Sequence, residues 1–204
     1  MISRIFPALT LKQAQNSMRI VAGKYKGQKL TEIKGRQIRP TSDRVREALF
    51  SILSPSMENA LVLDLFAGTG ALGLEAISRG ASKSVFVDKS REAIGIIKKN
   101  IKLLKIQDEA EVVLQDVRTL KNLKAFSGQK FDLIFMDPPY NKGLLGNVFA
   151  DSDFLDMIKD NSIIIAEHSS REKDIAKVSG FDRYDKRTYG EISLSFFKKK
   201  SIST

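Results

Sequence analysis

The sequence contains no cysteine and only one histidine, His168, among its 204 residues. The lack of cysteine excludes disulfide scaffolds, zinc fingers, cysteine nucleophiles and cysteine-bound iron–sulfur clusters, and a single histidine excludes a histidine-rich metal site. We therefore expect no metal, and any catalysis must use carboxylates, hydroxyls, backbone groups or a bound cofactor. The longest apolar runs, such as Ile163-Ile164-Ile165-Ala166, are far shorter than the roughly 20 residues that span a bilayer. We expect a soluble, cytoplasmic protein with no membrane contact.

Acidic residues are scarce in the first third of the chain. Residues 1–60 hold eleven Lys and Arg against four Asp and Glu, whereas residues 61–204 hold 23 against 20. A basic surface of this kind fits a polyanion, because neutralising phosphates releases counterions. A solvated basic face that only aids solubility is the alternative. The residues that we expect to contact a polyanion are Lys24, Lys26, Arg36, Arg39, Arg44 and Arg46.

The N-terminal third divides into an extension and a basic unit. Residues 1–17 contain no acid and no sustained apolar run, and we expect a disordered extension or an upstream start there. Residues 18–57 are expected to form a small hairpin, followed by a helix that ends before Pro55. The apolar residues of that helix fall on one face, and we expect Arg44 and Arg46 on the other.

From residue 58 to 204, short apolar runs alternate with segments of helical period, which is typical of a buried parallel sheet with crossover helices. The expected strands are 61–66, 85–88, 111–115, 131–137 and 162–167. The expected helices are 71–79, 91–104, 117–126 and 144–159, the last of them broken. The stretches 181–189 and 191–197 predict a final antiparallel hairpin. The fold class is therefore α/β and Rossmann-like, with a mostly parallel seven-stranded sheet.

A glycine-rich loop follows the first of these strands. Gly68, Gly70 and Gly73 fit the pattern G-x-G-x-x-G between a strand and a helix, and Asp88 ends the next strand. Glycines let the backbone pass close to a ligand, and an acid after the second strand can accept hydrogen bonds from ribose hydroxyls. The pattern predicts a nucleoside-containing cofactor without deciding which one.

The acids around this loop narrow the choice of cofactor. Asp64 would repel the pyrophosphate of a dinucleotide such as NAD, but would attract the ammonium group of S-adenosylmethionine; capping of the loop amides is the alternative role. Asp116 is placed to meet the amine of an adenine or to cap a helix, and the two roles are compatible. A Walker phosphate loop is excluded, because no Lys-Ser or Lys-Thr follows the glycines. The expected cofactor-binding residues are Asp64, Phe66, Ala67, Gly68, Thr69, Gly70, Asp88, Lys89, Ser90, Asp116, Val117 and Thr41.

Asp137, Pro138, Pro139 and Tyr140 follow the fourth strand, at the edge where open α/β sheets bind ligands. Prolines have no N–H donor, so the Asp137 carboxylate and the Pro138 carbonyl form an acceptor-only site beside an aromatic ring. Such acceptors can draw the lone pair of a base amine out of conjugation and align it with an electrophilic methyl group. We expect these four residues to be catalytic, with Tyr140 stacked on the base. A rigid surface turn is the alternative.

These motifs resemble the RsmD family of bacterial methyltransferases, and the resemblance covers roughly residues 18–198. The segments that carry it are Asp64-Leu65-Phe66-Ala67-Gly68-Thr69-Gly70, Asp137-Pro138-Pro139-Tyr140, Met18 to Gly23 with Lys26-Gly27, Arg39 to Glu47, and Tyr189-Gly190. The resemblance implies a Rossmann-like methyltransferase fold and methyl transfer from S-adenosylmethionine to guanine N2 of small-subunit ribosomal RNA, with the assembled subunit as the expected substrate. It also implies that residues 39–46 lie beside both the cofactor and the RNA, and that the target base leaves its stack.

Other functions remain open at this stage. An adenine-N6 DNA methyltransferase would use the same chemistry, but no target-recognition domain is evident in 204 residues. An NAD-dependent oxidoreductase is disfavoured by Asp64, and a non-catalytic RNA-binding assembly factor is disfavoured by an intact Asp137. We expect a monomer.

Overall fold

The computed structural model describes residues 18–33, 43–118, 120, 130–139, 144–172 and 178–200. Residues 1–17 and most of the helix expected at 117–126 lie outside these ranges, as do the site candidates Arg36, Arg39, Thr41 and Tyr140.

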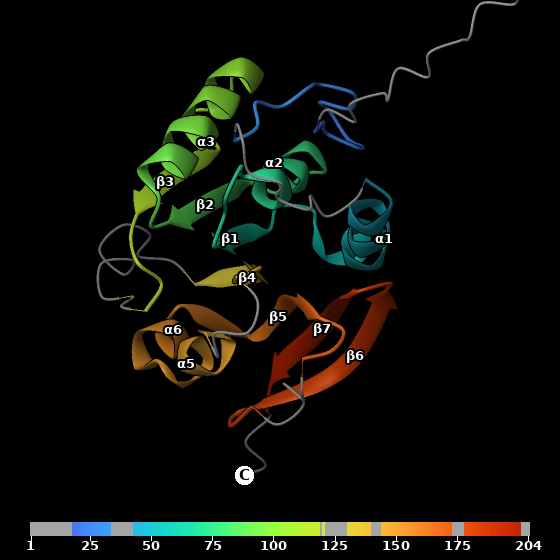
Figure 1. Cartoon of the computed structure of the whole chain (residues 1–204), viewed down its shortest axis with the longest axis vertical. Helices are drawn as coiled ribbons and strands as arrows, with labels where there is room; N and C mark the ends of the chain where they lie inside the picture. Colours follow the sequence, from blue (N-terminus) through green and yellow to red (C-terminus); the bar gives the residue numbers. More distant parts are fainter. Residues whose placement is uncertain are drawn as a thin grey trace, which may run out of the picture.

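The described residues form one seven-stranded sheet with helices on both faces (Figure 1). Its strands are β1 (Leu61–Leu65), β2 (Lys83–Asp88), β3 (Ala110–Leu114), β4 (Phe131–Met136), β5 (Ile158–Ser169), β6 (Phe181–Tyr189) and β7 (Ile192–Lys199). Their order is β3-β2-β1-β4-β5-β7-β6. The first five strands pair in parallel, and β7 pairs antiparallel with both β5 and β6. The predicted fold class, with its C-terminal antiparallel hairpin, is confirmed.

The strand β5 begins earlier than the sequence pattern predicts, because residues 158 and 159 were expected in the preceding helix. The pairing of β4 with β5 shifts register between Phe131 and Leu133. Ser162 satisfies the backbone at this irregularity: its hydroxyl donates to the Phe131 carbonyl at 2.6 Å and accepts from the Lys159 amide at 2.7 Å. A local bulge therefore extends the strand beyond its regular apolar run.

Helices cover the sheet on both sides. Helices α1 (Asp43–Leu53), α2 (Ala71–Ser78) and α3 (Arg91–Leu104) lie on one face, and α5 (Leu144–Ala150) and α6 (Ser152–Asp156) lie on the other (Figure 1). A short 3-10 turn, Ser54–Ser56, follows α1 at the predicted proline stop. The break between α5 and α6 was also predicted, and the Asp151 carboxylate caps the second helix there.

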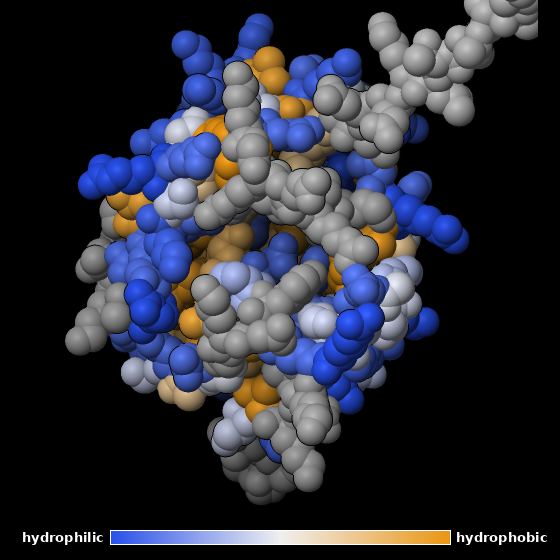
Figure 2. Space-filling view, in the orientation of Figure 1, coloured by the Kyte–Doolittle hydropathy of each residue, from blue (hydrophilic) through white to orange (hydrophobic). Residues whose placement is uncertain are grey.

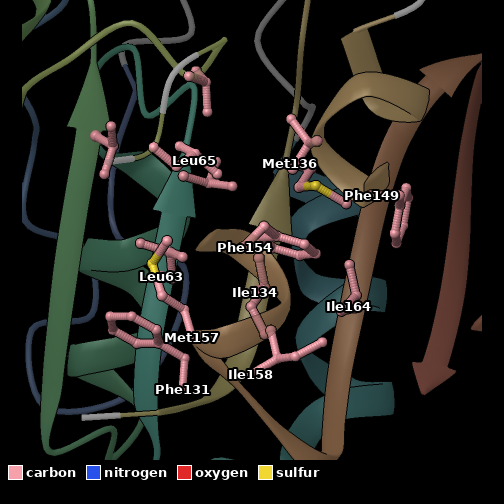
Figure 3. Close-up of a cluster of buried hydrophobic side chains, with 14 of the residues drawn as sticks. Leu63, Leu65, Phe131, Ile134, Met136, Phe149, Phe154, Met157, Ile158 and Ile164 are labelled. Carbon is pink, nitrogen blue, oxygen red and sulfur yellow. The ribbon is translucent and has the colours of Figure 1, made fainter. Parts of the chain in front are cut away.

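The core beneath α5 and α6 is built from alternate residues of the parallel strands. Leu63 and Ile134 point from β1 and β4 toward Phe149 of α5 and Phe154 of α6 (Figure 3). All four of these side chains are buried. Close packing of these buried side chains holds the central strands of the sheet in fixed positions. The loops that follow these strands therefore begin at fixed positions too.

The N-terminal residues 18–33 pack on the opposite face and have no core of their own. Arg19 and Lys29 form an antiparallel bridge, as the predicted hairpin requires. Ile20 and Leu30 are buried in a cluster with residues of α2 and α3. The hairpin is thus built onto the same body that carries the glycine loop (Figure 1).

No helix among the described residues is both long and apolar enough to cross a membrane.

Candidate cofactor and base-binding site

The strands β1 and β4 are adjacent and parallel, with Leu65 opposite Met136 at their carboxyl ends. The chain leaves β1 toward β2 and β3, and returns to the other side of β1 as β4. Such a reversal opens a crevice for ligands outside the carboxyl ends of the strands. The glycine loop after β1 and the Asp137-Pro138-Pro139 segment after β4 therefore meet at one edge of the sheet.

The glycine loop uses backbone conformations that few residues adopt. Phe66 has φ +65°, Gly68 has +55° and Gly70 has +79°. Gly70 is the N-cap of α2, and a Cβ there would also lie 3.2 Å from Ile97. A Cβ on Gly73 would lie only 2.3 Å from the ring of Phe86. The first residues of the motif thus shape the turn, and Gly73 lets α2 pack closely on β2.

Asp88 ties this loop to the end of β2. One carboxylate oxygen accepts a hydrogen bond from the Gly68 amide at 2.9 Å, and the other accepts from the Ser90 amide at 2.8 Å. Each carboxylate oxygen can accept a further bond, so ribose hydroxyls still have an acceptor here. Ser90 in turn caps α3 by accepting from the Ala93 amide, and Lys89 is exposed beside it.

Asp64 is 2% exposed, and its carboxylate accepts a hydrogen bond from the Gly73 amide at 3.0 Å. This is the loop-capping contact that the sequence left open as an alternative. Burial raises the pKa of Asp64 from its ordinary 3.8 to about 7, and the negative charge of Asp88 adds to the rise against the lowering by the Gly73 bond. A cationic group next to Asp64 would offset the cost of burying its charge.

Asp137 is half-buried at the same edge, and the parallel register that pairs Met136 with Ala166 places it beside Glu167 of β5. Burial raises the pKa of Asp137 well above its usual range, and the negative charges of Glu167 and then Asp64 raise it further. Sequence reasoning gave no role to Glu167, which is 4% exposed. The signal that could have revealed it was an acid at the end of the predicted strand 162–167, since the ends of parallel strands share one edge of the sheet.

Pro138 is buried and Pro139 is exposed. The structure thus describes the first three of the four predicted catalytic residues, at the same edge of the sheet as the glycine loop. Tyr140, the fourth member, lies outside the described residues.

Asp116 follows β3 at the same edge but is engaged by Arg118. The Arg118 guanidinium donates to both carboxylate oxygens, at 2.6 to 3.1 Å, and the Arg118 amide donates to Oδ1 at 3.0 Å. These bonds lower the pKa of Asp116 to about 2, so the carboxylate stays ionised. Val117 between them is buried. An adenine amine at Asp116 would share the carboxylate with this arginine.

The basic candidates separate into exposed and buried residues. Lys24, Lys26 and Arg44 are exposed. On the face shown in Figure 2, most of the coloured residues around the outside are hydrophilic. The expectation that Arg46 lies on the exposed face of its helix is wrong, because its side chain is 2% exposed. Helical periodicity places Arg46 on the same face as the buried Phe50.

Arg46 makes contacts inside the protein in place of a surface contact. Its Nη2 donates to the Arg19 carbonyl at 2.7 Å and to Asp43 at 2.8 Å. Its Nε lies 3.8 Å from a carboxylate oxygen of Glu75, which is itself fully buried. A guanidinium enclosed in this way has no route to an RNA phosphate.

Sequence reasoning missed Glu75, whose carboxylate holds the N-terminal segment. It accepts hydrogen bonds from the Val21 amide at 2.7 Å and the Ala22 amide at 2.9 Å, and it pairs with Arg79 at 2.7 Å. The available signal was a single acid within the apolar sequence of α2. An acid in such a helix must find buried partners, because an unpaired buried charge is costly.

His168, the single histidine of the chain, is 1% exposed and bonded within the sheet. Its ring nitrogens lie 3.0 Å from the Ser169 carbonyl and 2.9 Å from the Ser195 hydroxyl. In the part of the chain that the structure describes, no group of three or more His, Cys, Asp and Glu side chains could hold a metal ion.

Comparison with known proteins places the chain in a family. The family model described as conserved hypothetical protein 95 matches residues 18–198. A relative from Haemophilus influenzae, named ribosomal RNA small subunit methyltransferase D, is 34% identical over 91% of this chain and 95% of its own. The chain belongs to the RsmD family.

Two further proteins match most of this chain, one in sequence and one in both sequence and fold. A protein of Bacillus subtilis named putative rRNA methyltransferase YlbH is 35% identical over 90% of this chain and 100% of its own. The solved structure of putative methyltransferase yhhF from Escherichia coli is 32% identical, with a TM-score of 0.76 over 90% of this chain and 98% of that one. The RsmD-like sequence and the Rossmann-like methyltransferase fold therefore occur together over the whole described body.

Proposed function

We propose that this protein transfers a methyl group from S-adenosylmethionine to the exocyclic N2 amine of a guanine in small-subunit ribosomal RNA. The observation that carries the proposal is the position of Asp137 and Pro138. They follow β4, and the glycine loop follows the adjacent parallel strand β1 at the same edge of the sheet. The names of the related proteins from Haemophilus influenzae and Bacillus subtilis support ribosomal RNA as the substrate class.

The residues at this edge fit S-adenosylmethionine. The buried Asp64 carboxylate, with its raised pKa, suits the ammonium of the methionyl group, and Asp88 suits the ribose hydroxyls. The loop from Phe66 to Gly70 offers a close backbone approach. When bound, S-adenosylmethionine supplies an electrophilic methyl group.

Asp137 and Pro138 prepare the accepting nitrogen. An amine conjugated into a base ring is a weak nucleophile, and hydrogen bonds to the Asp137 carboxylate and the Pro138 carbonyl would localise its lone pair and orient it. The nitrogen becomes acidic once it carries the methyl group, and its extra proton passes to Asp137 or to water. A raised pKa makes the Asp137 carboxylate, when it is ionised, a stronger proton acceptor than an ordinary aspartate.

The exposed basic residues Lys24, Lys26 and Arg44 supply a surface for the RNA backbone. The proposed substrate is the assembled small subunit, from which the target guanine must leave its stack to reach Asp137.

The test is methyl transfer from labelled S-adenosylmethionine to small ribosomal subunits that lack guanine-N2 methylation. Naked ribosomal RNA and duplex DNA are assayed alongside, and the labelled nucleoside is identified. We expect N2-methylguanosine on subunits, and labelling about 100-fold or more slower with the Asp137→Asn variant. Label in DNA adenine would replace the proposal with a DNA methyltransferase. Binding of the cofactor without label in any substrate would favour a role in subunit assembly.

A further inference from the structure

Asn100 of α3 links two segments that are far apart in the sequence. Its side-chain nitrogen donates to the Thr31 carbonyl and to the Thr69 carbonyl, both at 3.2 Å. Its side-chain oxygen accepts from the Thr31 amide at 2.7 Å. The side chain is fully buried, so these bonds have no competition from water.

Thr69 lies in the glycine loop and Thr31 lies in the N-terminal segment, and other contacts join the same two segments. The Thr69 hydroxyl donates to the Met18 sulfur at 3.1 Å. Ala67 of the loop is buried in one cluster with Ile20. The N-terminal segment therefore lies against the outer side of the glycine loop, along α2 and α3 (Figure 1).

We propose that Asn100 is a positioning residue that couples the glycine loop to the basic N-terminal segment, so that occupation of one stabilises the binding conformation of the other. This inference rests on the proposed function, because it takes the loop as the cofactor site and the N-terminal segment as part of the RNA surface. The Thr69 carbonyl is the point of contact: a ligand that orders the loop holds this carbonyl in place, and with it the Asn100 amide and the Thr31 backbone. Coupling of this kind is reciprocal.

The contacts made by Asn100 explain why an apolar or smaller residue would not serve. A side chain at this position must donate twice and accept once to satisfy two backbone segments inside the core. Removing it leaves the Thr31 amide and two carbonyls without these partners and lets the loop and the N-terminal segment move separately. The sequence signal is a lone asparagine between the buried Ile97 and Ile101.

Hydrogen exchange of the Thr31 amide, followed by NMR with and without S-adenosylhomocysteine, tests the coupling in the unmodified protein. We expect the ligand to slow this exchange at least about fivefold, the lower end of typical coupling factors. The Lys200 amide, which donates to the Gly180 carbonyl at 2.9 Å in the C-terminal hairpin, is the internal control. Equal protection of both amides would show global stabilisation only and would overturn the inference.

The Asn100→Ala variant tests the residue itself. We expect S-adenosylhomocysteine to bind this variant about fivefold or more weakly than it binds the unmodified protein. Within the variant, the exchange rate of the Thr31 amide should be the same with and without the ligand. The matched control is Ser162→Ala, which also removes a buried polar side chain, a hydroxyl that bonds two backbone groups, but far from the loop. We expect it to lose stability and to keep the protection of Thr31. Undiminished protection in Asn100→Ala would contradict the inference, and the measurement on the unmodified protein stands even if this variant does not fold.

The outcomes separate this inference from the proposed function. Methyl transfer to subunits without protection of Thr31 overturns the coupling alone. Protection of Thr31 without methyl transfer overturns the proposed reaction and keeps the coupling. Failure of S-adenosylhomocysteine to bind the unmodified protein overturns both.

Discussion

At the scale of single residues, Asp137 is the side chain on which the proposed chemistry depends most directly. We predict that Asp137→Asn lowers the rate of methyl transfer by about 100-fold or more, because an amide can present an N–H to the target amine in place of an acceptor. The affinity for S-adenosylhomocysteine should stay within a few-fold, since the proposed binding site for that ligand is the glycine loop with Asp88. Single-turnover kinetics and calorimetry measure the two effects.

Asp88→Ala, measured in the same two assays, should affect ligand affinity more than the rate of methyl transfer. It removes the acceptor for the Gly68 and Ser90 amides, so we expect weaker ligand binding as its main effect. Equal losses of ligand affinity in the Asp88 and Asp137 variants would refute this division of roles.

Asp64 predicts a pH dependence of ligand binding. With a pKa of about 7, the Asp64 carboxyl is mostly protonated below pH 7 and ionised above it. The ammonium of the ligand favours the ionised form, so binding below pH 7 must release a proton. We predict that the affinity for S-adenosylhomocysteine rises with pH, by up to about tenfold per unit, and levels off above pH 7.

Calorimetry from pH 5 to 8 measures this dependence, and buffers of different ionisation enthalpy report the released proton. The control is Asp64→Asn, which can still accept from the Gly73 amide but cannot titrate, and its affinity should vary little with pH. A flat profile for the unmodified protein would remove Asp64 from the ammonium site.

At the scale of elements, the N-terminal hairpin packs closely on α2 at Gly23 and Ser78. Gly23 and Gly27 both have φ +83°, but a Cβ on Gly23 would lie 1.8 Å from the Ser78 carbonyl oxygen, whereas Gly27 has nothing within 4 Å. The two alanine variants therefore share the backbone strain and differ in the clash. We predict that Gly23→Ala costs about 1–3 kcal/mol more stability than Gly27→Ala.

Urea unfolding of both variants measures this difference. Equal costs would mean that the hairpin does not dock on α2 as described. A further readout is RNA binding, which should weaken in Gly23→Ala if the docked hairpin presents the basic surface.

The Glu75 carboxylate stabilises the same junction between the hairpin and α2 through its ion pairs and hydrogen bonds. We predict that Glu75→Ala destabilises the protein by about 3–5 kcal/mol, because it leaves Arg46 and Arg79 in the interior without their shared carboxylate. Glu47→Ala, on the exposed side of α1, is the matched control and should stay within about 0.5 kcal/mol of the unmodified protein. Thermal or urea unfolding measures the stability of both variants. Similar losses of stability in the two would show that the buried network around Glu75 contributes little.

At the scale of the whole molecule, the described N-terminal segment that carries Lys24 and Lys26 lies over α2 and α3, and the edge strand β6 lies at the other end of the sheet. We predict that Lys24→Gln and Lys26→Gln each weaken RNA binding and reduce the slope of log affinity against log salt by about 0.7–0.9. Filter binding over a range of salt concentrations measures the slope. Lys186→Gln on β6 removes the same charge far from this surface, and its slope should not change; an equal change would mean that net charge alone attracts the RNA.

Much of the fold follows from patterns that are local in the chain. Apolar runs at the central strands and the helical period of 91–104 reflect burial of each segment's own residues. The glycine motif and Asp137-Pro138-Pro139 are contiguous, so their place after a strand can be read without knowing what lies opposite. Sequence alone therefore determined the α/β class, the place of the glycine loop between a strand and a helix, and the edge of the sheet on which the proposed chemistry depends.

The tertiary structure decided how distant residues pair. Arg46 was expected at the surface, but its partner Glu75 lies on another helix, and only the folded packing of α1 on α2 brings the two charges together. Asn100 likewise acquires its role from Thr31 and Thr69, which approach each other only when the hairpin folds back over α3. The physical reason is that a polar group inside a protein must satisfy its hydrogen bonds, and which partner does so depends on contacts that no local pattern encodes.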